Sequence, residues 1–161
     1  VFKAEKNVKL FTSHHIYTET EISSRYEILL ENYVKTIHIE AKTLYSMVEQ
    51  QFMPALLHYT DTLSSSIADK KAVADLPCTA ETALLKDMSA AYESLYTLSE
   101  KLAADTAEAE GLTDNTKASF FYHDTIIKDM DDIRAVADKA EVKLPKEFLP
   151  YPSYEEMLFY V

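Results

Sequence analysis

Glycine is almost absent from this chain of 161 residues, which contains one glycine, five prolines, one cysteine and no tryptophan. Glycine and proline are the usual residues of tight turns, so a chain this poor in both favours long helices over many short strands. A glycine-rich phosphate loop and the G-x-S-x-G motif of hydrolases each need at least two glycines and are excluded. A single cysteine excludes an internal disulfide, and an intracellular origin is the simplest interpretation.

Basic residues are also scarce, with 16 Lys and Arg against 27 Asp and Glu and a net charge of −11. Phosphate backbones and anionic lipids repel such a chain, so we expect neither a nucleic acid nor a membrane as partner. The longest apolar runs, such as FMPALL, are far shorter than the roughly 20 residues of a membrane span. The opening VFKAEKNVKLF does not resemble a signal peptide, and Val1 in place of Met suggests a piece of a larger protein.

Apolar residues make up 47% of the chain, which predicts a folded core, and the length suits a single domain over residues 1–161. They recur at steps of three and four, which predicts long helices at 18–69, 78–109 and 114–141. The first helix begins at a capping box from Thr18 to Glu21. Pro54 predicts a kink or a break in that helix. The apolar residues that form a stripe along one face of this first helix are Tyr26, Leu30, Tyr33, Ile37, Ala41, Leu44 and Val48.

The second and third predicted helices carry stripes with the same steps. The seam of the second is typical of a coiled coil and suits packing at roughly +20° against its neighbours. It comprises Leu84, Met88, Ala91, Leu95, Leu98 and Leu102. The third stripe comprises Tyr122, Ile126, Met130, Ile133, Ala137 and Ala140.

The last segment, residues 145–161, is predicted to be a docking tail. Pro145 and Pro150 prevent the third helix from continuing, and a second capping box from Ser153 to Glu156 predicts one or two further helical turns. Aromatic residues are dense here, and left in water they would favour aggregation, so we expect them to dock on something. They are Phe148, Tyr151, Tyr154, Phe159 and Tyr160.

The fold class that follows is all-α. Short connections between the predicted helices imply antiparallel neighbours. We therefore expect an antiparallel up-and-down bundle of three long helices, the first kinked or split at Pro54, with short helical segments at the N- and C-terminal ends. There is no strand-like alternation and no internal repeat.

One pattern partly matches the zinc deaminase motif, H-x-E followed by P-C-x-x-C. His38 and Glu40 give the first half, and Cys78 follows Pro77. The second zinc-binding cysteine would stand at position 81, which is Glu81. Residues two apart on a helix also point about 200° away from each other. We interpret His38 as flanking the buried stripe and Glu40 as solvated.

The other candidate constellations also favour structural interpretations. None of the five histidines has a glutamate three residues before it, as a di-iron bundle requires, and adjacent His14 and His15 fit a surface loop. Cys78 stands at a helix start, where its pKa can fall, but no histidine is assigned to it, so we interpret it as inert. The acidic runs KDMDDIRAVADKAE and DTAEAE fit helix faces with i,i+4 ion pairs better than a divalent-ion site. We predict no catalytic, cofactor-binding or metal-ligating residue.

Two stretches carry a resemblance to a known family. NVKLFTSHHIYTETEISSRYEILLENYVKTIHIEAKTL and LPYPSYEEMLFYV together resemble the C-terminal region of bacterial type III glutamine synthetases, most strongly over residues 7–57 and 143–161. The family pattern often has Asn at position 38 and Trp at position 149, where this chain has His38 and Leu149. Neither position has a known chemical role in the family.

The resemblance implies a larger parent enzyme that joins glutamate and ammonia into glutamine with ATP, Mg or Mn, and a γ-glutamyl phosphate intermediate. Such enzymes are cytoplasmic and form stacked hexameric rings, and their catalytic sheet would precede Val1. The chain itself would then be a non-catalytic accessory domain that supports the subunit or its assembly. Its partners would be the catalytic domain of the same chain and neighbouring subunits, and the tail from Phe148 to Val161 would pack on the bundle or on that catalytic domain. A free-standing helical interaction module is the alternative, and an enzyme in its own right is a third.

Overall fold

The computed structural model describes residues 2–74, 76–152 and 154–159, and within these residues every regular element is helical. The all-α class is therefore confirmed. The elements are α1 (Glu5–Ser13), α2 (Glu19–Met47), η1 (Val48–Phe52), α3 (Met53–Val73), α4 (Thr79–Glu110), α5 (Asn115–Phe121), η2 (Tyr122–Ile126), α6 (Ile127–Glu141), η3 (Lys146–Phe148) and α7 (Tyr154–Leu158). No helix in the described part of the chain is long and apolar enough to cross a membrane.

Helix α2 begins at the predicted capping box. The Thr18 side chain accepts a hydrogen bond from the Glu21 amide, and the Glu21 carboxylate accepts one from the Thr18 amide at 2.8 Å. These two bonds satisfy backbone donors that a helix start leaves free. The Thr18 amide and the Thr18 hydroxyl, which lies 2.9 Å from the same Glu21 oxygen, both donate to the charged carboxylate and so lower the pKa of Glu21.

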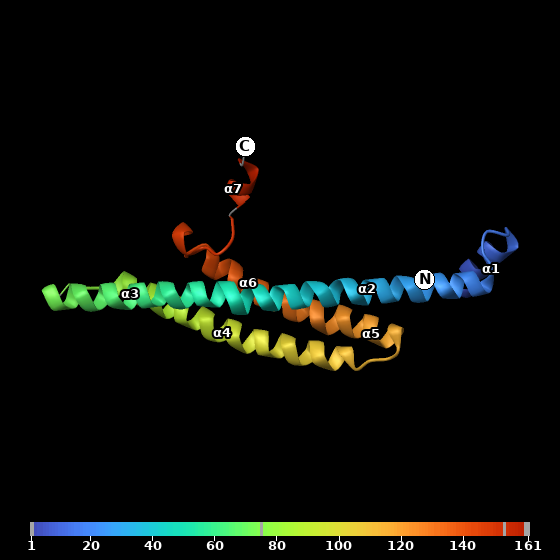
Figure 1. Cartoon of the computed structure of the whole chain (residues 1–161), viewed down its shortest axis with the longest axis horizontal. Helices are drawn as coiled ribbons and strands as arrows, with labels where there is room; N and C mark the ends of the chain where they lie inside the picture. The colour runs from blue at the N-terminus through green and yellow to red at the C-terminus, as the bar shows by residue number, and fades with distance from the viewer. Residues whose placement is uncertain (1, 75, 153, 160–161) are drawn as a thin grey trace.

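Of the kink or break expected at Pro54, the break does not occur. Helix α2 leads into the π-helical turn η1 and then into α3, with helical backbone angles at Met47, Phe52 and Met53. Figure 1 shows α2 and α3 in line, as one rod that reaches Val73 rather than residue 69. Pro54 is the second residue of α3, but because the backbone before it is helical, it lies inside the rod, where its missing N–H has a cost. The π-helical turn before it supplies the local adjustment that a proline inside a helix requires.

The third predicted helix is also composite. It begins at Asp114, whose carboxylate accepts hydrogen bonds from the amides of Thr116 and Lys117, and it runs to Glu141 through the π-helical turn η2. A short turn at Gly111 separates it from α4, which ends at Glu110. Of the three long helices expected, α4 is a single helix, whereas the first and the third are rods made of joined pieces, and the short N-terminal segment α1 precedes them.

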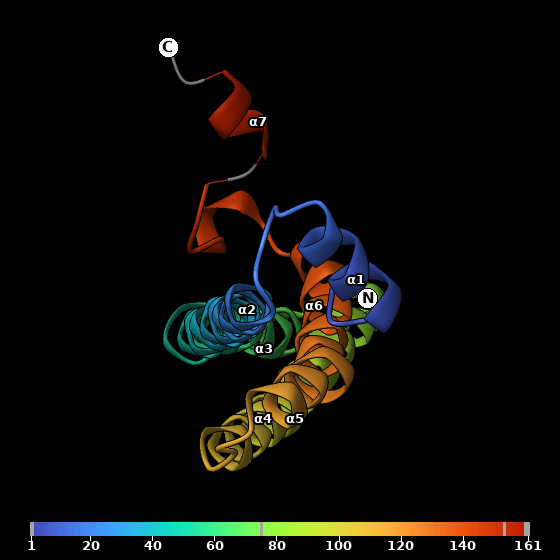
Figure 2. The ribbon, with the colours of Figure 1, turned by 90° about the vertical axis from the view of Figure 1, so that its right-hand side faces the viewer.

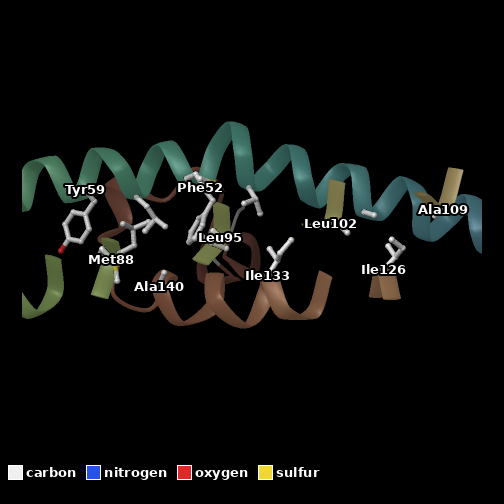
Figure 3. Packing of buried hydrophobic residues seen from close by; sticks show 14 of the residues in the cluster. Phe52, Tyr59, Met88, Leu95, Leu102, Ala109, Ile126, Ile133 and Ala140 are labelled. Atoms are coloured by element: carbon white, nitrogen blue, oxygen red, sulfur yellow. The ribbon is translucent and has the colours of Figure 1, made fainter. Parts of the chain in front are cut away.

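Successive rods run in opposite directions, and the core lies between them (Figure 1). Helix α4 packs against both α3 and α6, while α2 packs against α5. The apolar stripes supply most of the core, and Figure 3 shows them converging from the three rods. The most deeply buried members include Phe52, Leu56, Met88, Leu95, Leu102, Ile126 and Ile133.

The tail divides into a docked part and an exposed part. Phe148 contacts Tyr59 with ring centroids 5.1 Å apart, and Tyr151 stacks on Phe52 at 6.1 Å. Beyond them, Leu158 and Phe159 are 77% and 76% exposed. Figure 2 shows α7 projecting away from the rods. The expected capping box from Ser153 to Glu156 lies outside the described residues, because Ser153 is not among them.

Candidate functional site

His38 belongs to a polar cluster that joins three elements. Its Nδ1 lies 2.8 Å from the hydroxyl of Tyr122 in η2, and its Nε2 lies 3.4 Å from Glu110 Oε1 at the end of α4. Lys42 contacts the same Glu110 oxygen at 2.8 Å. The Lys42 ammonium, and to a smaller extent His38, hold the pKa of Glu110 below its usual value. Burial, reinforced by Glu110, raises the pKa of Tyr122.

The residues of the deaminase-like pattern do not lie together in the structure. Both imidazole nitrogens of His38 are engaged, Glu40 is exposed, and Glu81 pairs with Lys70 at 2.6 Å. Cys78 caps the start of α4, whereas His38 faces its last residue. Helix α4 has 32 residues. At 1.5 Å per residue it is roughly 48 Å long, so His38 and Cys78 cannot share a zinc ion.

Cys78 itself is buried, with its Sγ 3.6 Å from the Leu76 carbonyl oxygen. Cys78 occupies the N-cap position of α4, yet its side chain makes no capping hydrogen bond. Among the described residues, no group of three or more His, Cys, Asp or Glu side chains is arranged to hold a metal ion.

A second polar cluster lies between α4 and α6. Asp129 is 2% exposed and contacts the Lys101 ammonium, which also lies 3.1 Å from Asp105 Oδ2. Burial raises the pKa of Asp129 although Lys101 opposes the shift, and the same contact raises the pKa of Lys101. In the described part of the chain, Asp129 Oδ2 is buried without a hydrogen-bond partner. The sequence offered no signal for this burial, because Asp129 stands in a run that was interpreted as a solvated face.

Elsewhere in that run, Arg134 pairs with Asp138 at 3.6 Å across one helical turn, as interpreted, but Asp131 and Glu141 form no ion pair with a described residue. A further buried contact joins the first two rods, where the Ser99 hydroxyl donates to the Glu49 carboxylate in η1. These polar groups join neighbouring helices through hydrogen bonds and ion pairs. Paired in this way, they are suited to fixing the relative positions of the rods.

The candidate functional feature is a surface rather than a reaction centre. A groove of about 730 Å³, here called the tail groove, lies between α2, α6 and the tail. Its apolar lining includes Leu44 and Met47 from α2, Met130 from α6, and Tyr151 and Met157 from the tail. Next to it, α7 and the residue after it expose Met157, Leu158 and Phe159. Exposed apolar side chains beside an apolar groove are features that proteins often have at interaction sites.

The fold defines the chain as an all-helical domain. Residues 1–71 match the family model described as the glutamine synthetase C-terminal domain. The match includes residues 7–57, where the resemblance was expected to be strongest.

Comparison with curated proteins extends the likeness to nearly the whole chain. The chain is 41% identical over 157 residues to a glutamine synthetase of Butyrivibrio fibrisolvens, with 97% of the chain covered, and 28% identical over 163 residues to a type-3 glutamine synthetase of Dictyostelium discoideum. A glutamine synthetase of Bacteroides fragilis strain YCH46 is 24% identical over 149 residues. The chain spans about a fifth of the length of these relatives, 22%, 22% and 20% in turn. The resemblance to the C-terminal helical domain of glutamine synthetases is thereby confirmed.

Proposed function

We propose that this chain is a non-catalytic accessory domain of a cytoplasmic glutamine synthetase, in which it supports the subunit or its assembly. Its partners are the catalytic domain of the same chain and neighbouring subunits. Glutamate, ammonia, ATP and Mg or Mn then belong to the remainder of the parent enzyme. The antiparallel rods act as a stiff support, because paired polar side chains such as Glu110, Asp129 and Glu49 lock them together.

The exposed end of the tail carries this proposal. Leu158 and Phe159 are more than three-quarters exposed, and Met157 beside them is 56% exposed. Transfer of a large apolar side chain from water into an interface contributes about 1.5–3 kcal/mol when burial is complete. Three such side chains, two on α7 and one on the residue after it, therefore provide a strong docking element for another surface of the enzyme.

The test uses the full-length glutamine synthetase that contains this region, with Leu158→Asp and Phe159→Asp introduced together. We expect the double variant to lose assembled particles in size-exclusion chromatography with light scattering. The matched control is Val73→Asp with Leu76→Asp, which adds the same two negative charges at the far end of α3 on residues that are 88% and 51% exposed. Equal assembly of the double variant and the control would contradict the proposal.

A free-standing interaction module is the second candidate, and the tail groove favours it, because an apolar groove can receive a partner helix. The DNA upstream of the Val1 codon separates the two candidates. Several hundred in-frame codons of glutamine synthetase support the accessory domain. A stop codon followed by a start codon supports the module.

A further inference from the structure

The tail groove combines an apolar floor with an acidic rim. Asp131, Asp138 and Glu141 line it together with a single basic residue, Arg134, which is paired with Asp138. Neither Asp131 nor Glu141 forms an ion pair with a described residue. Glu141 and Asp138 reinforce the effect of burial in raising the pKa of Tyr151, on the groove wall, to about 12. An occupant that matches this groove is apolar and carries positive charge.

The opposite character appears on α1 and the turn that follows it. Residues 2–16 contain three lysines and one glutamate, although the whole chain has a net charge of −11. Lys6 and Lys9 are exposed and form no ion pair with a described residue, and they stand on one face with Leu10. Leu10 and Ile16 are 51% and 55% exposed. This basic, apolar surface, here called the α1 knob, has the chemistry that the tail groove selects.

The α1 knob is held in place before any partner arrives. Phe11 contacts Phe2 and Tyr17 with ring centroids 5.9 and 5.7 Å apart, and Lys3 pairs with Glu27 of α2 at 3.1 Å. A preorganised element binds with a smaller entropy cost than a mobile one.

One molecule cannot fill its own groove with its own knob. Figure 1 places α1 at one end of the long rod, well apart from α6 and α7. The complementary surfaces therefore meet only between two copies, in a head-to-tail contact that joins different surfaces of each copy.

We propose that the tail groove of one copy binds the α1 knob of a second copy, with Leu10 and Ile16 over the apolar floor and Lys6 and Lys9 facing Asp131 and Glu141. This contact deepens the proposed assembly role by naming the two surfaces that meet.

The test measures self-association of the 161-residue chain by sedimentation velocity over a wide concentration range. We expect the wild type to associate as concentration rises. Lys6→Glu with Lys9→Glu, or Asp131→Lys with Glu141→Lys, should weaken the association about tenfold, because attraction becomes repulsion at two positions. Combination of all four substitutions should restore it. Lys117→Glu with Lys128→Glu, two exposed lysines on α5 and α6, is the matched control and should leave it unchanged.

A second measurement locates the contact directly. A photo-crosslinking amino acid at position 10 should join peptides from residues 127–141, in pairs of mixed isotope content when labelled and unlabelled chains are combined. A monomer at every concentration, or charge reversals that act no more strongly than the control, would overturn the proposal. The assembly role itself is tested separately, since the tail substitutions in the full-length enzyme leave Lys6, Lys9, Asp131 and Glu141 intact.

Discussion

At the scale of single residues, Asp129 shows how packing changes the chemistry of a side chain. Three other acids stand close to it in sequence, and Asp131 and Asp132 are exposed. Asp129 instead faces α4, where burial raises its pKa above the usual value. A carboxyl whose folded pKa is raised binds its proton more tightly in the folded state. Ionisation therefore lowers stability as the pH rises through that folded pKa.

Substitution of Asp129 by Asn tests this cost. The amide keeps an acceptor for Lys101 and carries no charge, so we expect the free energy of unfolding to rise by about 1 kcal/mol at pH 7. Urea denaturation of the two proteins should show the difference shrinking as the pH falls from 7 through the raised pKa of folded Asp129, because the wild-type carboxyl then takes up its proton. A variant less stable than the wild type at pH 7 would mean that the ion pair with Lys101 outweighs the burial of charge.

At the scale of elements, the π-helical turn η1 explains how the rod tolerates Pro54. The turn lies directly before the proline, and Val48 and Phe52 within it are 4% and 1% exposed. The extra residue of a π-helical turn changes which side chains face the core. Sequence alone predicted a kink or break here because the usual cost of proline inside a helix assumes an unmodified α-helix.

Substitution of Pro54 by Ala should raise the free energy of unfolding by about 1 kcal/mol, part of the roughly 3 kcal/mol that separates these residues in a helix interior. Alanine restores an N–H donor and removes the proline ring from the preceding turn. Thermal unfolding monitored by circular dichroism measures the change, with Pro152→Ala in the exposed tail as the control. A lower melting temperature for Pro54→Ala would show that the proline is needed to hold η1.

The tail offers a matched pair of truncations. Removal of residues 148–161 should lower the free energy of unfolding by about 3 kcal/mol, because Phe148, Leu149 and Tyr151 pack on the core. Removal of residues 153–161 alone should change it little, because Met157, Leu158 and Phe159 are exposed. Chemical denaturation of both truncations provides the comparison. An unchanged free energy of unfolding for the longer deletion would reject docking of the tail on the core.

At the scale of the whole molecule, the charge imbalance is a source of self-repulsion. Local ion pairs relieve part of this repulsion, although they leave the net charge at −11. Salt screens repulsion between exposed charges over about 10 Å at 0.1 M. We expect the melting temperature to rise by roughly 2–4 °C between 10 mM and 500 mM NaCl, the shift that about 1 kcal/mol produces in a domain of this size. KCl should act equally, and a fall with either salt would indicate that local ion pairs dominate.

Much of the helical framework could be predicted from the sequence. The steps of three and four located the helices at Thr79–Glu110 and Glu19–Val73 to within a few residues, and Thr18 and Glu21 located a start. Helix α1 was expected only as a short N-terminal segment. These features are local, since they depend on residues within one or two turns of each other.

The sequence by itself determined that this chain forms long amphipathic helices with apolar stripes, and that it is related to glutamine synthetases. Only the tertiary structure decided that Asp129 is buried, that His38 meets Tyr122 and Glu110, that π-helical turns adjust both composite rods, and that the tail leaves an acidic groove open beside it. The physical reason is distance along the chain. His38 and Tyr122 are 84 residues apart, and which side chains meet across such a separation depends on how whole rods pack, a property that no local pattern records.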